Sequence, residues 1–175
     1  RYTLTNDDIQ QANPLVLAKN TLWNSTVYQE LRSLVRQKKP DVAHFHNTFP
    51  LISPAAYYAL KEEGVPVVQT LHNYRLLCPN ALFFRNGKVC EDCLGKPLPL
   101  PGVIHGCYRG SRSASAMVAA TVSFHSMLGT WSKEVDVFIA YSQFAMQKFI
   151  EGGLPKEKLA FKTNFLHPAP EPGDG

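Results

Sequence analysis

The chain has 175 residues, of which 45% are hydrophobic, and this is enough to bury the core of one globular domain. Eighteen Lys and Arg against 14 Asp and Glu give a net charge of +4. Because the basic residues are scattered, we expect no nucleic-acid partner, whereas peripheral contact with an anionic membrane is compatible with the charge. Residues 113–131 form a long apolar stretch, but Ser, Thr and His interrupt it, so no membrane span is predicted.

The two ends of the chain carry little structural signal. The chain begins at Arg1 without an initiator Met and without a charged and then apolar leader. We therefore expect no signal peptide, a cytoplasmic location and a piece cut from a longer protein. The Pro- and Gly-rich end, residues 167–175, is predicted to be a linker or a disordered tail.

Four short β-type runs alternate with helical patterns along the chain. The runs are Asp41 to His46, Val65 to Thr70, Asp136 to Tyr141 and Lys158 to Lys162, and three of them are rich in Val, Ile and Phe. Strands that alternate with helices are typical of a parallel sheet. The pattern therefore predicts an α/β fold with helices on both faces of the sheet.

Helices are predicted from apolar periodicity and from capping residues. The stretch Leu22 to Lys38 has one apolar face and stops before Pro40. Ser53 can cap a second helix, which has Pro54 in its first turn and ends at Gly64.

Two more helices are predicted in the second half of the chain. One starts at Ser111 or Ser113, and the other runs from Ser142 to about Glu151 and ends at Gly152. The apolar residues at helical spacing in the first of these are Met117, Ala120, Phe124, Leu128 and Trp131.

A long irregular insertion, residues 76–110, is rich in Pro and Gly and contains all four cysteines. They are Cys78, Cys90, Cys93 and Cys107, around a central CxxC. Four thiolates suit a tetrahedral zinc ion, which would supply stability that the weak local core cannot, so we predict a structural zinc. Disulfides are the alternative in an oxidising compartment, unbonded cysteines or an iron–sulfur cluster also stay open, and His105 is a possible substitute ligand.

Several segments, in this order and spacing, resemble the N-terminal domain of glycosyltransferase family 4, whose members have the two-domain GT-B fold. The resemblance runs from about Lys39 to Leu166. The segments are KPDVAHFHNTFPLISPAAYYAL, VPVVQTLHNYRLLCPNALFFRNGKVCEDC, HGCYRGSRSAS and DVFIAYSQFAMQKFIEGGLPKEKLAFKTNF.

The resemblance implies a Rossmann-like domain over residues 1–166 that holds the acceptor of a retaining hexosyltransferase. In this family a C-terminal domain holds the nucleotide sugar, and that domain is absent here. The family's first strand is also missing, so that the chain starts at what resembles the second strand, Tyr2 to Thr5. The resemblance therefore implies a fragment that transfers no sugar by itself and binds nucleotide sugars weakly. The intact enzyme would build a surface polysaccharide or glycolipid with a carbohydrate or lipid-linked acceptor.

Candidate site residues follow two of the predicted strands. His72 and Asn73 come directly after a strand, at the carboxyl end of the parallel sheet where ligands bind in open α/β folds. The family places a His after this strand, in contact with the transferred sugar, so the resemblance implies a catalytic role for His72. His46 and Asn47 follow the strand before it and are candidates for acceptor binding. His44 lies on the same strand face as His46.

Two further residues are candidates for binding anionic groups. Arg75 could bind an acceptor phosphate or the diphosphate of a lipid-linked sugar, or form a surface salt bridge. Ser142 starts a helix whose N-terminal amides could bind an anion, although capping alone explains a Ser there. Tyr141 stands where the family commonly has a small or aliphatic residue.

Two other functions stay open. A metal-assisted hydrolase of a small ester or lactone could use His46 and His72, although the sequence has no GxSxG and no HExxH motif. A non-catalytic binding module is the second alternative. Loss of the family's central strand would also leave one edge of Asp41 to His46 unpaired, which favours self-association unless Tyr2 to Thr5 fills the gap.

Overall fold

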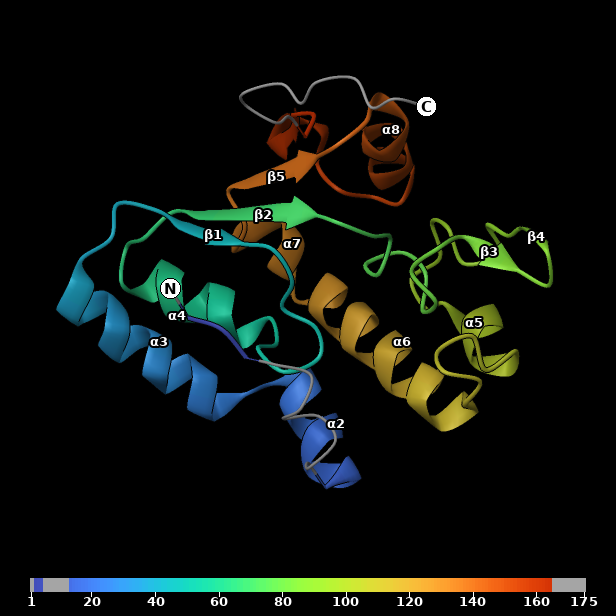
Figure 1. Cartoon of the computed structure of the whole chain (residues 1–175), viewed down its shortest axis with the longest axis horizontal. Helices are drawn as coiled ribbons and strands as arrows, with labels where there is room; N and C mark the ends of the chain where they lie inside the picture. Colours follow the sequence, from blue (N-terminus) through green and yellow to red (C-terminus); the bar gives the residue numbers. More distant parts are fainter. Residues whose placement is uncertain (1, 5–12, 165–175) are drawn as a thin grey trace, which may run out of the picture.

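The computed structural model describes residues 2–4 and 13–164, and within them four parallel strands form one sheet (Figure 1). The strand order is β1 (Ala43–Phe45), β2 (Val67–Leu71), β5 (Val137–Ala140) and β6 (Leu159–Phe161). The pairing places Ala43 opposite Val67. The α/β, Rossmann-like prediction is confirmed, and each predicted strand is present with slightly shifted bounds. Residues 2–4 form no strand, so the predicted strand there is wrong as far as it is described.

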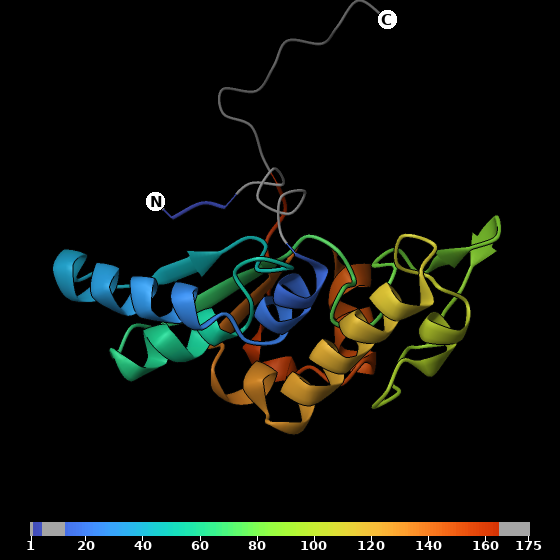
Figure 2. The same cartoon turned by 90° about the horizontal axis from the view of Figure 1, so that it is seen from below.

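Helices pack around this sheet. The main ones are α2 (Pro14–Leu22), α3 (Ser25–Lys38), α4 (Ala55–Glu62), α6 (Arg112–Met127), α7 (Thr130–Lys133) and α8 (Gln143–Glu151). A short 3₁₀ helix, η1 (Lys156–Lys158), precedes β6. Helices α3 and α4 lie side by side in both views (Figures 1 and 2).

The contact between α3 and α4 carries an ion cluster. Arg32 donates to Glu63 over 2.6 Å and pairs with Glu62 over 3.0 Å, and Arg36 donates to Glu63 over 2.8 and 2.9 Å. These hydrogen bonds, first from Arg36 and then from Arg32, lower the pKa of Glu63 to about 2. The cluster therefore joins the two helices through their exposed ends.

The predicted helix from Leu22 to Lys38 is wrong at its start. The helical conformation is interrupted after Leu22, and α3 begins at Ser25. The side chain of Asn24 caps α3 by accepting from the Val27 amide over 3.1 Å. The apolar face of this helix is confirmed, since Val27, Leu31 and Val35 are buried.

The start of α4 also differs from the prediction. Pro54 occupies the cap position and Ser53 lies one residue earlier, at a φ of 64°. Its buried hydroxyl still serves the helix start, because it accepts from the Ala55 amide over 3.3 Å and from the Asn24 amide over 2.9 Å. Ser53 therefore ties the starts of α3 and α4 together.

Helix α6 starts as predicted, with Ser111 accepting from the Ala114 amide over 3.2 Å, but its buried face is not the predicted one. Phe124 and Leu128 are 38% and 43% exposed, whereas His125 is fully buried. His125 is held between the Thr130 hydroxyl and the Leu22 carbonyl, each 2.9 Å away. The polar partners of His125, rather than apolar periodicity, decide which face turns inward.

The insertion between β2 and α6 contains little regular structure. It holds the two-residue strands β3 (Phe84–Arg85) and β4 (Lys88–Val89), which pair as a hairpin, and the short helix α5 (Leu100–Ile104). Both views show the hairpin and α5 at one end of the molecule, away from the sheet (Figures 1 and 2). The prediction of an irregular insertion is confirmed.

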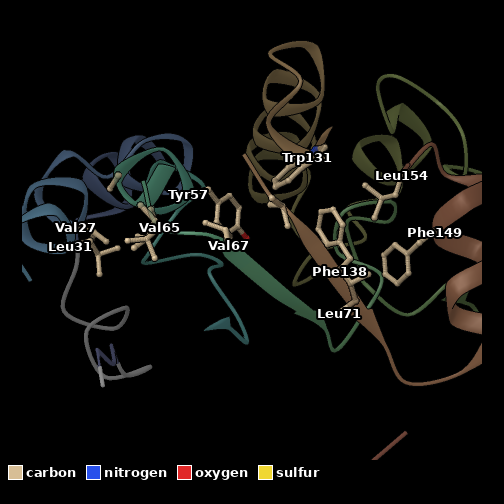
Figure 3. Close-up of a cluster of buried hydrophobic side chains, with 14 of the residues drawn as sticks. Val27, Leu31, Tyr57, Val65, Val67, Leu71, Trp131, Phe138, Phe149 and Leu154 are labelled. Atoms are coloured by element: carbon tan, nitrogen blue, oxygen red, sulfur yellow. The ribbon is translucent and has the colours of Figure 1, made fainter. Parts of the chain in front are cut away.

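The hydrophobic core lies between the sheet and its helices (Figure 3). Val67 and Phe138 come from neighbouring strands and are fully buried. Tyr57 of α4 and Trp131 of α7 meet edge to face at 6.2 Å, and Phe149 of α8 is 1% exposed. This packing fixes β1 and β2, and with them the residues that follow each strand.

Candidate functional site

Polar side chains gather at the carboxyl ends of β1 and β2. His46 and Asn47 follow β1, and His72 and Asn73 follow β2, as their strand-end positions predicted. All four line one open cavity of about 50 Å³. A cavity of this size has room for a few water molecules, and therefore for a few polar groups of a ligand rather than a whole sugar.

The two histidines contact each other directly. Nδ1 of His46 lies 2.9 Å from Nε2 of His72, so one ring donates a hydrogen bond and the other accepts it. On the other side of His72, Nδ1 has only a long contact of 3.4 Å with the Tyr141 hydroxyl. The Nδ1 atom of His72 is therefore the ring nitrogen best able to exchange its partner for a ligand.

The environment of His72 and of the neighbouring His44 favours their neutral form. Burial, followed by the nearby charge of His46, lowers the pKa of His72. Burial and then His46 also lower the pKa of His44, whose ring lies 4.4 Å from that of His46. His44 is fixed by a 2.7 Å contact with the Thr70 hydroxyl. Near neutral pH His44 and His72 are thus favoured as imidazoles that can donate and accept hydrogen bonds, not as imidazolium cations.

Arg75 lines the same cavity, and its guanidinium is held by aromatic rings. The central carbon lies 5.1 Å from the Phe49 ring and 4.8 Å from the Tyr108 ring, and the group donates a short hydrogen bond to the Pro79 carbonyl. Burial lowers the pKa of Arg75. Within residues 2–4 and 13–164 no carboxylate forms an ion pair with it, so the predicted surface salt bridge is not observed there.

A polar network that sequence reasoning missed lies beneath the cavity. The Tyr57 hydroxyl donates to Oε1 of Gln69 over 2.8 Å. The amide nitrogen of Gln69 donates to the carbonyls of Thr70, over 2.6 Å, and His46, over 3.3 Å. Gln69 thereby holds the end of β1 against β2. A Gln within an otherwise apolar strand is the signal that could have found it.

The remaining predicted residues have local structural contacts. The side chain of Asn47 accepts from the Phe49 amide over 3.3 Å, and that of Asn73 accepts from the Arg75 amide over 3.0 Å, which shapes both strand-end turns. Ser142 caps α8 by accepting from the Ala145 amide over 3.0 Å. Ser142 does not line the cavity. Capping therefore accounts for Ser142 without a ligand.

The four cysteines line a second, smaller cavity of about 10 Å³ in the insertion. All four are free thiols, and His105 lines a different surface hollow. Burial, followed by the neighbouring sulfurs of Cys78 and Cys107, raises the pKa of Cys93 to about 11. As the side chains stand, the described residues contain no group of three or more His, Cys, Asp or Glu arranged to hold a metal ion.

Among the helices of residues 2–4 and 13–164, none combines the length and the apolar character that crossing a membrane requires. The interrupted stretch at residues 113–131 is α6 and α7, which pack against the rest of the molecule.

Comparison with known proteins relates the chain to one family of glycosyltransferases. The model of Glycosyltransferase Family 4 matches residues 5–166. A curated relative from Klebsiella pneumoniae, described as an uncharacterized 42.6 kDa protein in the cps region, is 26% identical over 139 residues. The match covers 77% of this chain and 30% of the relative, so the chain spans about a third of the relative's length.

A solved structure, UDP-N-acetylglucosamine 2-epimerase from Rickettsia bellii, matches with a TM-score of 0.39 and 16% identity. The match covers 77% of this chain and 24% of the epimerase chain, and at this TM-score it supports no conclusion. The family match, in contrast, extends over most of the chain and includes every residue of the strand-end cavity. The chain therefore belongs to glycosyltransferase family 4.

Proposed function

We propose that this chain supplies the acceptor side of a retaining glycosyltransferase that moves a hexose from a nucleotide sugar to a carbohydrate or lipid-linked acceptor. The observation that carries the proposal is the strand-end cavity, in which His46, His72 and Arg75 meet in a chain of glycosyltransferase family 4. The cavity is open to solvent and its polar groups come from two neighbouring strand ends, as in ligand sites of open α/β folds.

Arg75 supports an acceptor that carries a phosphate or diphosphate. Its stacking between Phe49 and Tyr108 fixes the guanidinium before any ligand arrives, and no carboxylate of the described residues competes for it. A preorganised guanidinium binds phosphate oxygens with little further loss of side-chain entropy. A lipid-linked sugar attached through a diphosphate fits this chemistry.

His72 supports a contact with the sugar being transferred. As a neutral imidazole it can offer Nδ1 to a hydroxyl of that sugar while Nε2 stays bonded to His46. Such a hydrogen bond, if it shortens as positive charge develops on the sugar ring, lowers the energy of an oxocarbenium-like transition state. His46 then acts as a positioning residue for His72.

The transfer reaction itself is proposed for a longer protein, since the chain spans about a third of its curated relative. The nucleotide sugar would contact groups outside this chain. A cytoplasmic location and a part in building a surface polysaccharide belong to the same proposal. So do peripheral membrane contact and self-association through the outer edge of β1, which light scattering over a concentration series would test.

The experiment that tests the proposal is a binding measurement. Calorimetry with a short prenyl diphosphate-linked monosaccharide should give measurable affinity, and the same sugar without the diphosphate should bind more weakly. Arg75→Ala should weaken binding of the diphosphate compound by about tenfold or more, as expected when a charge-assisted hydrogen bond is lost. Arg109→Ala is the matched control, because Arg109 stacks on the same Tyr108 ring but is exposed and lies outside the cavity.

The alternatives give different results in the same preparation. Equal affinity for both compounds would contradict the role of Arg75, and no affinity for either would contradict the acceptor site. Tight binding of free nucleotide sugars by this chain would mean that the donor site lies here. Turnover of a small ester or lactone that stops with a chelator would favour the hydrolase instead.

A further inference from the structure

The four cysteines come from distant parts of the insertion and line one cavity. Cys78 lies in the turn after β2, Cys90 and Cys93 follow the β3–β4 hairpin, and Cys107 follows α5. Backbone hydrogen bonds hold their positions, including Cys90 to the Phe83 carbonyl at 2.8 Å and Cys107 to the Gly102 carbonyl at 2.9 Å. These are all the cysteines of the chain, and all four line the same cavity.

Apolar packing holds only parts of the surrounding segment, namely Leu77 and Phe83 in the core and α5 against α6. Its strands are two residues long, and an isolated hairpin of that kind is marginal at best. Large apolar side chains of the segment point outward, with Leu82 66%, Val89 72% and Ile104 53% exposed. The segment nevertheless has a defined path that brings four thiols together. A cross-link at the cysteines would explain this path where apolar packing does not.

We propose that Cys78, Cys90, Cys93 and Cys107 bind one zinc ion as a tetrathiolate site. The cavity of about 10 Å³ is close to the space that a single water molecule needs, which suits one ion. Four thiolates at about 2.3 Å around zinc is the arrangement of closed structural sites. The nucleotide-sugar chemistry proposed above plays no part in this inference.

Binding requires two changes from the thiol form that the structure shows. The four sulfurs must come within bonding distance of one ion, and each thiol must lose its proton to solvent, so that metal binding releases protons. Arg85 lines the same cavity and is paired with Asp92 at 2.8 Å. Its guanidinium would offset the net negative charge of a zinc tetrathiolate.

The zinc site would also fix the neighbourhood of Arg75. Cys78 precedes Pro79, whose carbonyl accepts the hydrogen bond from Arg75, and Cys107 precedes Tyr108, whose ring lies 4.8 Å from the guanidinium. Two of the three partners of Arg75 are thus one residue away from a proposed metal ligand. Loss of the metal should free the Arg75 side chain, which can be observed without any ligand in the strand-end cavity.

Elemental analysis of the untagged protein, purified without added metal, tests the proposal. We expect about one zinc per chain, as one closed tetrahedral site requires. Cys93→Ser should lose the zinc, whereas His105→Ala, a control in the same segment that does not line the cysteine cavity, should keep it. In the zinc-free protein the NMR signal of the Arg75 side chain should sharpen toward that of a free guanidinium.

A second measurement covers the case in which the serine variant does not fold. Wild-type protein reloaded with cobalt(II) should show the intense visible bands of tetrahedral thiolate coordination. Three results would overturn the proposal. These are four thiols that react freely in the native metal-free protein with unchanged stability, two disulfides in non-reducing mass spectrometry, or iron in place of zinc.

Discussion

The strand-end site and the cysteine segment lie next to each other but are stabilised in different ways. Beneath the strand-end site, Val67, Phe138 and Tyr57 are almost fully buried, and Gln69 ties two strand ends together. The cysteine segment exposes many of its large apolar residues and has two-residue strands. The difference shows that one region is held by packing, whereas the other depends on a few specific contacts near the cysteines.

The largest expected effect comes from removing core packing under the strand-end site. Phe138→Ala should destabilise the protein by about 3–5 kcal/mol, because it deletes a fully buried ring in β5. Chemical denaturation measures this as a fall in the free energy of unfolding. Phe144→Ala, on an exposed ring of α8, should stay within about 0.5 kcal/mol of wild type. Similar losses for both variants would contradict a core centred on the sheet.

A second pair of variants introduces the same methyl group on the core side of the insertion and beside its cysteines. An added Cβ at Gly152 would lie 2.2 Å from the buried Leu77 side chain, and one at Gly102 would lie 2.6 Å from the Pro79 ring beside the cysteines. Each clash should cost about 1–3 kcal/mol as overpacking does. We expect Gly152→Ala to lower global stability and Gly102→Ala to loosen the cysteine segment alone.

Hydrogen exchange distinguishes these two outcomes. In Gly102→Ala, amides between residues 81 and 107 should exchange faster while those of β2 keep their protection, because local opening need not unfold the sheet. In Gly152→Ala, protection should fall in both regions together. If β2 loses protection to the same degree in Gly102→Ala, the two regions form one cooperative unit and the comparison fails.

The sequence predicted the sheet well because strand signals in an α/β fold are local. The runs around Val67 and Phe138 are short, apolar and bounded by turn residues, and His46 and His72 follow strands whose direction fixes where they emerge. The same reasoning failed for α6. Its buried face is set by His125, which contacts the Leu22 carbonyl and the Thr130 hydroxyl. The apolar periodicity of the helix gives no sign of these two contacts.

Part of the strand-end site was equally invisible to sequence reasoning. Arg75 could be singled out by its position after β2, but its stacking partners Phe49 and Tyr108 lie 26 and 33 residues away in the chain. Tyr141 stands where the family commonly has a small or aliphatic residue, and its hydroxyl contacts His72 in the structure. Contacts between residues of different helices, strands or loops can be assigned only once the fold is known.

A smaller effect on the free energy of unfolding is expected at the ion cluster between α3 and α4. Arg36 and then Arg32 lower the pKa of Glu63 from its ordinary value of 4.5 to about 2. A carboxylate with a lowered folded-state pKa stabilises the fold above pH 4.5, and this contribution is lost as the pH falls from 4.5 toward 2. Glu63→Gln should remove this part of the acid dependence.

Denaturation at a series of pH values measures the acid dependence. The difference in unfolding free energy between wild type and Glu63→Gln should be constant near neutral pH and shrink as the pH falls below about 4.5. Glu157→Gln is the control, because Glu157 is exposed and forms no ion pair within the described residues. A pH-independent difference for Glu63→Gln would show that the cluster does not carry the linkage.

The smallest expected effect changes titration and leaves stability nearly untouched. His46 contributes to the lowered pKa of His72 after burial, because two imidazolium rings joined through nitrogens 2.9 Å apart would repel each other. His46→Ala should therefore move the NMR titration midpoint of His72 upward toward the ordinary value for histidine. His105→Ala, which removes a histidine outside the cavity, should leave that midpoint unchanged.

The direction in which the titration midpoint of His72 moves shows whether His46 or burial alone lowers the pKa of His72. If burial alone sets the pKa of His72, His46→Ala should leave the midpoint in place or lower it as the neighbouring space closes. An upward shift requires the two rings to interact in solution as they do in the structure. Because the cysteine segment does not contribute to this pair, removal of zinc should leave the His72 midpoint unchanged. The titration of His72 would then be independent of the cysteine segment, even though Arg75, which lines the same cavity as His72, contacts Pro79 and Tyr108 of that segment.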